Sequence, residues 1–127
     1  MDTPEDLRYL PSHEWARADG DRVTVGITDY AQDALGDIVY VELPTVGRSV
    51  AANEAFCEIE STKSVSEIYA PVAGEVIEVN GDLEDAPQKI NDSPYRDGWI
   101  CVIRASDPGA LNSLLDAAGY QATLSEE

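Results

Sequence analysis

The chain has 127 residues, of which 43% are hydrophobic and 26% charged, a composition typical of a globular protein and a length that suits one domain. We therefore expect residues 1–127 to fold as a single domain. The formal net charge of −17 would repel the phosphates of nucleic acids and of anionic membrane surfaces, so neither is expected as a partner. Basic protein partners would be attracted, although acidity that serves only solubility explains the charge equally well.

The sequence also lacks the signals of secreted or membrane proteins. No apolar run is long enough to span a bilayer, and the acidic first residues are unlike a secretory signal or a transit peptide. The two cysteines, Cys57 and Cys101, lie in apolar, strand-like segments, which predicts buried, reduced thiols rather than a disulfide framework. A cytoplasmic location is the simplest interpretation of these features.

The first part of the chain predicts a β-hairpin followed by a short helix. After a short strand at 8–10, the β-prone segments 15–18 and 22–27 flank an Asp-Gly sequence, which is a strong hairpin signal. Thr28 is a good N-cap for a helix of about two turns, and Gly36 suits the left-handed conformation that ends such a helix.

The next predicted strand, residues 37–43, has apolar side chains on both faces. Ile38 and Tyr40 are expected to point to one side of the strand, and Val39 and Val41 to the other. A strand that is apolar on both faces is typical of a position between two layers.

The rest of the chain predicts more short strands and a closing helix. The helix would be capped by Asp107, begin at Pro108 and carry a stripe of leucines. Before it, residues 80–98 are expected to be irregular. Many short strands joined by Gly/Pro turns favour a small β-sandwich or flattened barrel with short helices outside it. The strands are expected at 49–50, 54–60, 65–70, 75–79 and 99–103.

Residues for catalysis are scarce. The single histidine, His13, cannot assemble a His/Cys metal cluster and has no nucleophile motif beside it. No glycine-rich phosphate loop is present. The sequence therefore predicts neither a metal site nor an enzyme.

Lys63 is one of only two lysines and lies between two β-prone segments. Its neighbours Ser61, Thr62 and Ser64 are small and polar, which places the lysine at an exposed hairpin tip. The nearby acidic residues, such as Glu60, favour the charged amine and so argue against a Schiff-base nucleophile. Lys63 suits an attachment point that another enzyme modifies; the simpler alternative is an ordinary surface lysine.

Several blocks of the sequence keep a fixed order from about residue 7 to residue 120. The segment around the lysine reads ESTKSVSEIYAPVAGEV at 60–76, and the other blocks are SHEW at 12–15, VGITDYAQ at 25–32, LGDIV at 35–39 with LP at 43–44, and NDSPY at 91–95 with GW at 98–99. In this order and spacing the blocks resemble those of the glycine cleavage H proteins. Thr62 and Ser64 replace the Val and Ala that are frequent in that family, but both are small enough for recognition by a lipoylating enzyme.

The resemblance implies a fold and a set of site residues. The fold would be mostly β, a lipoyl/biotinyl-type barrel-sandwich hybrid of two antiparallel sheets with short peripheral helices. Lipoic acid would be joined to Lys63 as an amide. Glu14 matches a family glutamate in the cleft that holds the loaded arm, and Glu67 an acidic position beside the lysine; ordinary surface carboxylates are the alternative for both. The attachment loop would comprise Glu60, Ser61, Thr62, Ser64 and Val65.

The resemblance also implies a function without catalysis. Such a protein carries the aminomethyl group of glycine from a pyridoxal-phosphate glycine decarboxylase to a tetrahydrofolate-dependent aminomethyltransferase. The FAD enzyme lipoamide dehydrogenase reoxidises the carrier, and a lipoate-attaching enzyme modifies it. We expect a monomer. The alternatives are an H-like lipoate shuttle, another lipoyl carrier, a biotin carrier and an interaction module whose lysine is never modified. A biotin carrier would flank its lysine with methionines, which are absent here.

Overall fold

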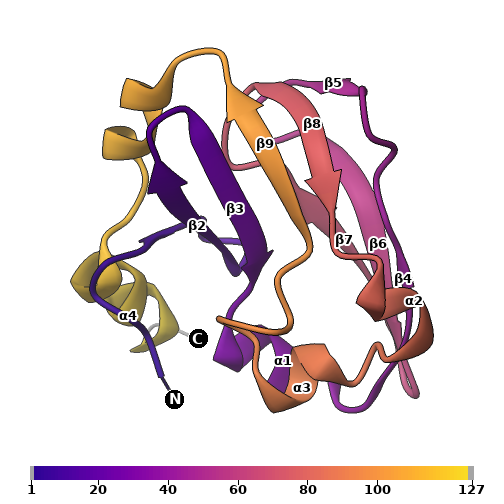
Figure 1. Ribbon diagram of the computed structural model, residues 1–127. Helices are drawn as coiled ribbons and strands as arrows, with labels where there is room; N and C mark the ends of the chain where they lie inside the picture. The colour runs from indigo at the N-terminus through magenta and orange to yellow at the C-terminus, as the bar shows by residue number, and fades with distance from the viewer. Residues whose placement is uncertain (1, 126–127) are drawn as a thin grey trace.

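Two antiparallel β-sheets form the framework of the chain, which a computed structural model describes for residues 2–125 (Figure 1). The first sheet has the strand order β1-β2-β3-β9-β8-β5, and the second has the order β4-β6-β7. The predicted mostly-β class with two antiparallel sheets is confirmed. The strands are β1 Arg8–Tyr9, β2 Glu14–Asp19, β3 Arg22–Ile27, β4 Ile38–Glu42, β5 Ser49–Val50, β6 Ala55–Ser61, β7 Val65–Tyr69, β8 Gly74–Val79 and β9 Cys101–Ala105.

Strands β2 and β3 form the hairpin that the Asp-Gly sequence predicts. The last pair is Asp19 with Arg22, and Gly20 adopts the positive φ of +65° that the turn requires. At the other end of the hairpin, Gly26 pairs with the fully buried Trp15. A Cβ on Gly26 would lie 2.6 Å from the indole ring, so glycine is needed there for the tryptophan to pack against the strand.

A bulge in β4 contradicts the prediction that this strand is covered on both faces. The register shifts between Ile38 and Tyr40, so alternation restarts within the strand. Ile38 and Val41 are therefore both buried, whereas Val39 and Tyr40 are 53% and 51% exposed. The outer face of the second sheet is open to solvent, as in many antiparallel sheets.

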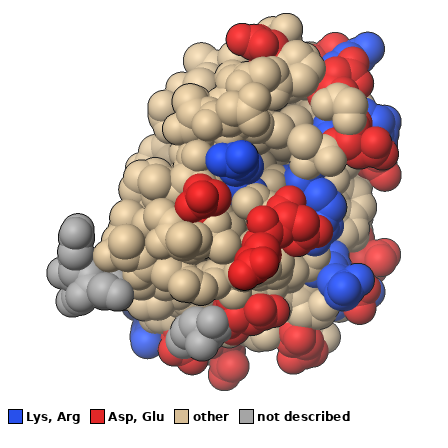
Figure 2. Space-filling model, turned by 90° about the vertical axis from the view of Figure 1, so that its left-hand side faces the viewer, with Lys and Arg blue, Asp and Glu red and all other residues tan. Residues whose placement is uncertain are grey.

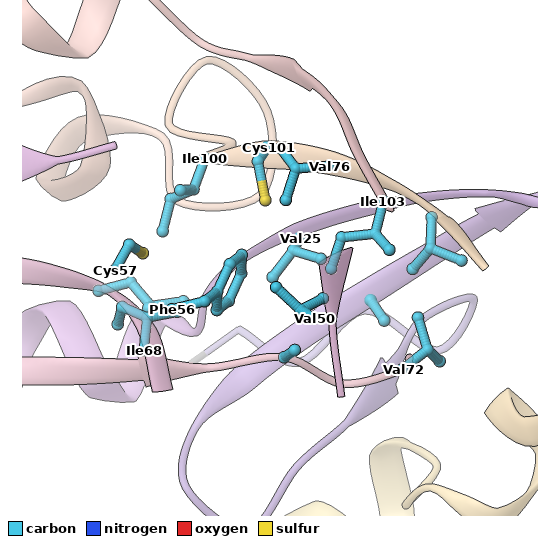
Figure 3. Packing of buried hydrophobic residues seen from close by; sticks show 14 of the residues in the cluster. Val25, Val50, Phe56, Cys57, Ile68, Val72, Val76, Ile100, Cys101 and Ile103 are labelled. Atoms are coloured by element: carbon cyan, nitrogen blue, oxygen red, sulfur yellow. The ribbon is translucent and has the colours of Figure 1, made fainter. Parts of the chain in front are cut away.

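Most apolar side chains fill the space between the two sheets (Figure 3). Phe56 and Ile68 of the second sheet face Cys101 and Ile103 of the first. A register shift in β6 allows both Phe56 and Cys57 to be buried. The two cysteines are free and buried, as predicted, and this burial raises the pKa of the Cys101 thiol to about 12 and that of Cys57 well above its usual value.

Short helices lie outside the sheets (Figure 1), namely α1 Asp29–Leu35, α2 Asp82–Asp85, α3 Lys89–Asp92, η1 Pro108–Ser113 and α4 Ala117–Ser125. Helix α1 begins and ends as predicted, because the Thr28 hydroxyl accepts a hydrogen bond from the Ala31 N–H at 3.2 Å and Gly36 has a φ of +82°. Within residues 2–125, none of the helices combines the length and apolar character needed to cross a bilayer.

Residues 80–98 are more regular than predicted, since α2 and α3 lie within them. The Asn80 side chain organises this stretch by donating hydrogen bonds to the carbonyls of Asp97, at 2.9 Å, and Trp99, at 2.8 Å. Strand β9 begins at Cys101 rather than at residue 99.

The C-terminal region differs from the single closing helix that the leucine pattern predicts. Asp107 does cap a helix that begins at Pro108, but this is the 3-10 helix η1. It stops because Leu115 extends to form a β-bridge with Tyr9, with N–H···O distances of 2.8 and 3.0 Å. Helix α4 then follows, and its fully buried Tyr120 stacks on the Tyr9 ring at 4.7 Å between centroids.

Candidate functional site

The turn between β6 and β7, residues 61–64, holds Lys63 at one end of the second sheet, and we call it the Lys63 turn. The Ser61 N–H donates to the Ser64 carbonyl at 2.8 Å. The Ser61 hydroxyl accepts from the backbone N–H groups of Lys63, at 3.3 Å, and Ser64, at 3.1 Å. Lys63 is exposed, so the hairpin tip predicted from the sequence is present. Hydrogen bonds within the turn keep its backbone in one conformation.

The Lys63 turn also rests on the segment that follows α1. The Thr62 N–H donates to the Asp37 carbonyl at 3.0 Å. The Lys63 stem passes close to Gly36, since a Cβ added to that glycine would lie 3.5 Å from Lys63 Cε. Within residues 2–125, the Lys63 amine forms no ion pair, unlike Lys89, which pairs with Asp82 at 3.4 Å. The amine is therefore presented to solvent on a supported backbone.

Carboxylates gather on the outer face of the second sheet beside this turn. Glu58 pairs with Glu42 on one side and with Glu67 on the other, which gives a row of three acidic residues across the strands. In the next row, Glu60 lies between the exposed Tyr40 and Val65. Like charges directly opposite one another in a sheet repel, and Arg48, which lines the same hollow as the three carboxylates, offsets part of this repulsion.

The opposite part of the molecule is poorer in charge. Figure 2 shows the side on which η1 and α4 lie, with uncharged side chains over most of its upper and left parts and charged ones in the middle and toward the right and lower edges. Residues 108–125 contain a single charged residue, Asp116. The acidity of the chain is thus unevenly distributed, and a basic partner would be drawn to the acidic faces, including that of the Lys63 sheet.

Glu14, the first residue of β2, is buried between the two sheets at 1% exposure. One carboxylate oxygen accepts a hydrogen bond from the Ser12 hydroxyl at 2.5 Å, and the other from the Tyr69 N–H at 3.0 Å. We call these three residues the Glu14 site. Burial raises the pKa of the Glu14 carboxyl to about 7 against the lowering effect of the hydrogen bonds.

Sequence reasoning did not identify Tyr69, which joins the two predicted acidic residues. Its N–H binds Glu14, and its hydroxyl donates to Glu67 at 3.2 Å, an interaction that raises the pKa of the Tyr69 phenol. Tyr69 and Lys63 lie at opposite ends of β7, and the strand from Val65 to Tyr69 is roughly 13 Å long. A backbone N–H carries no sequence signal, so this link becomes visible only in the structure.

Comparison with known proteins identifies the family of the chain. The family model described as "Glycine cleavage H-protein" matches residues 7–127. The glycine cleavage system H protein of Anaeromyxobacter sp. (strain K) is 56% identical over 127 residues, covering 100% of this chain and 99% of the relative. A protein of the same name from Thermus thermophilus is 58% identical, with the same coverage.

A solved structure shows the same architecture. The crystal structure of a glycine cleavage system H protein from Mycobacterium marinum superposes with a TM-score of 0.88 at 41% sequence identity, over 96% of this chain and 98% of that one. The predicted fold class is therefore confirmed by an experimental structure. With matches of this extent in sequence and in structure, the chain belongs to the glycine cleavage H-protein family.

Proposed function

We propose that this chain is the aminomethyl carrier of a glycine cleavage system and bears lipoic acid in amide linkage to the Lys63 amine. The observation that carries the proposal is the exposed lysine at the tip of a supported hairpin, without an ion-pair partner in residues 2–125, in a chain of this family. An exposed amine is accessible to a modifying enzyme, and the absence of an ion pair leaves none to break first. The residues fit the group, since the flanking Thr62 and Ser64 are exposed and small.

The chain's own residues would present and shelter the arm. The attachment loop, Glu60, Ser61, Thr62, Ser64 and Val65, would hold the modified lysine away from the sheets. When bound, the lipoyl group supplies a dithiol that can carry an aminomethyl group and be reoxidised. A tether on a fixed turn raises the effective concentration of such a group at a docked partner.

Glu14 would retain the cationic amine of the loaded arm. Two facts support this role: a carboxyl with a pKa of about 7 is partly ionised at neutral pH, and each of its oxygens keeps a second lone pair after accepting one hydrogen bond. The arm would have to run along β7 to reach it. Because Glu14 is almost fully buried, Ser12 or Tyr69 would have to move aside. Glu67, bonded to Tyr69, would line the same path.

The chain itself would be non-catalytic, and the chemistry would belong to its partners. His13 is engaged in the fold, since its Nδ1 lies 2.7 Å from the Tyr120 hydroxyl and its ring packs on Tyr30. The partners would be glycine decarboxylase, aminomethyltransferase, lipoamide dehydrogenase and a lipoate-attaching enzyme. We also propose a cytoplasmic monomer in which residues 1–127 form one domain.

Coexpression with a lipoate ligase tests the proposal. Intact mass should show one added lipoyl group in the wild type and in Lys89→Arg, and none in Lys63→Arg. Lys89→Arg is the matched control because it alters the only other lysine in the same way. Modification that persists in Lys63→Arg would reject the site. Lipoylated protein that supports no glycine/bicarbonate exchange with a cognate decarboxylase, yet donates lipoate elsewhere, would favour the H-like shuttle.

A further inference from the structure

The side chain of Asn91, in α3, bonds to α1, to the start of β4 and to the segment between them. Its Nδ2 donates to Gln32 Oε1 at 3.0 Å and to the Gly36 carbonyl at 2.8 Å. Its Oδ1 accepts from the Ile38 N–H at 2.9 Å. Both amide hydrogens and one carbonyl lone pair are therefore used. Helices α1 and α3 lie side by side below the sheets in Figure 1, which brings Asn91 to this segment.

These bonds hold the two residues on either side of Asp37, whose carbonyl supports the Lys63 turn. Asn91 binds Gly36 and Ile38, and the Asp37 carbonyl between them accepts the Thr62 N–H at 3.0 Å. In the part of the chain that the structure describes, this is the only hydrogen bond from residues 62–64 to a segment outside the β6–β7 hairpin. A continuous path of contacts thus runs from α3 to the lysine.

We infer that Asn91 is a positioning residue for Lys63. Asn91 fixes the Asp37 carbonyl and so keeps the Lys63 turn in one orientation. The inference rests on the proposed function in so far as the lysine is the lipoyl attachment site. An enzyme that modifies Lys63 must receive the turn in one geometry. If only a fraction of molecules has that geometry, the apparent affinity falls by that fraction while the bound complex reacts as before. Loss of Asn91 should therefore act on KM and not on kcat.

Asn80 provides a matched control. Its side chain also makes three hydrogen bonds, donating to the carbonyls of Asp97 and Trp99 and accepting from the Asp82 N–H at 3.3 Å. It is 5% exposed, so its loss should cost the fold at least as much as the loss of Asn91. None of its partners lies in segments 36–38 or 61–65. A general loss of stability would therefore appear in both variants, whereas a positioning effect would appear only at Asn91.

The experiment measures lipoyl attachment to the full-length, unmodified chain by a lipoate ligase supplied with ATP and lipoate. For Asn91→Ala we expect the KM for the carrier to rise roughly three- to tenfold with kcat within about twofold of wild type. Amide hydrogen exchange of Thr62 should accelerate in parallel. Asn80→Ala should change neither KM nor Thr62 exchange. Asn91→Asp keeps the acceptor for Ile38 but turns a carboxylate oxygen, which cannot donate, toward the Gly36 carbonyl, so its KM should rise at least as much as that of Asn91→Ala.

The outcomes separate this inference from the proposed function. Equal KM values for the two alanine variants, or Thr62 exchange unchanged in Asn91→Ala, would overturn the positioning role. If Asn91→Ala does not fold, Asn91→Asp carries the same test. A KM and a Thr62 exchange rate equal to those of the wild type in Asn91→Asp would then overturn the positioning role. Wild-type protein that is not lipoylated at Lys63 would instead contradict the proposed function, and Thr62 exchange would still decide whether Asn91 holds the turn.

Discussion

The two ends of β7 hold their polar groups by opposite means. The Lys63 turn is exposed, and its internal hydrogen bonds join residues at most three positions apart. The Glu14 site is buried, and its bond to Tyr69 joins residues 55 positions apart. The comparison shows that the exposed turn is held mainly by hydrogen bonds between near neighbours, with one link to Asp37, whereas the enclosed end is held by contacts between segments far apart in the sequence. Changes at the two ends should therefore differ in size and in kind.

The largest expected difference is in pH dependence. The pKa of the Glu14 carboxyl is raised from 4.5 to about 7, so the folded state binds more protons than the unfolded state between these values. Stability should therefore be fully present below about pH 4.5 and fall as the pH rises toward 7, by on the order of 3 kcal/mol from this group. Urea unfolding across this range should show that the wild type loses stability relative to Glu14→Gln as the pH rises, because glutamine does not ionise. A difference that stays constant with pH would contradict the buried carboxyl.

Truncation at the two ends should also differ in its cost. Glu14→Ala leaves the Tyr69 N–H and the Ser12 hydroxyl without their acceptor and should lower the free energy of unfolding by about 1–3 kcal/mol. Lys63→Ala removes an exposed side chain and should change the free energy by less than about 0.5 kcal/mol. Chemical denaturation measures both. Equal losses would mean that the two ends do not differ in the way described.

Within the Lys63 turn, the side chain of Ser61 binds the backbone, whereas that of Ser64 does not. Ser61→Ala removes the acceptor of two backbone N–H groups and should cost about 0.5–1 kcal/mol, with faster amide exchange at Lys63 and Ser64. Ser64→Ala is the control, because in the described residues its hydroxyl has no hydrogen-bond partner. If both variants exchange at the same rate, the Ser61 hydroxyl is not what fixes the turn.

The smallest expected effect is on the carboxylate row of the second sheet. Glu58→Gln removes the middle charge between Glu42 and Glu67 and should stabilise the protein by a few tenths of a kcal/mol, less at high salt. Glu60→Gln is the control, since its cross-strand neighbours are Tyr40 and Val65. Thermal unfolding at low and high ionic strength measures the effect, and destabilisation by Glu58→Gln would show that the row is not repulsive.

What the sequence predicted follows the same division. The hairpin tip at Lys63, the Thr28 cap and the reduced cysteines depend on neighbouring residues or on apolar runs, and pattern reasoning predicted them. The predictions of a β4 strand covered on both faces and of a single closing helix were wrong. The exposure of Tyr40 and the early end of η1 depend on pairing with strands that are distant in the sequence. The contacts of the candidate site with Tyr69 and Asn91 are likewise long-range, so neither residue stood out in the sequence.

The buried cysteines have a consequence for the cargo of such a carrier. Thiol–disulfide exchange needs an accessible thiolate, and a raised pKa leaves very little thiolate at neutral pH. Cys57 is 7% exposed and Cys101 fully buried, with the pKa of each thiol raised. A lipoyl arm that alternates between disulfide and dithiol would therefore meet no accessible thiolate of its own protein, and its redox state would be left to the enzymes that it visits.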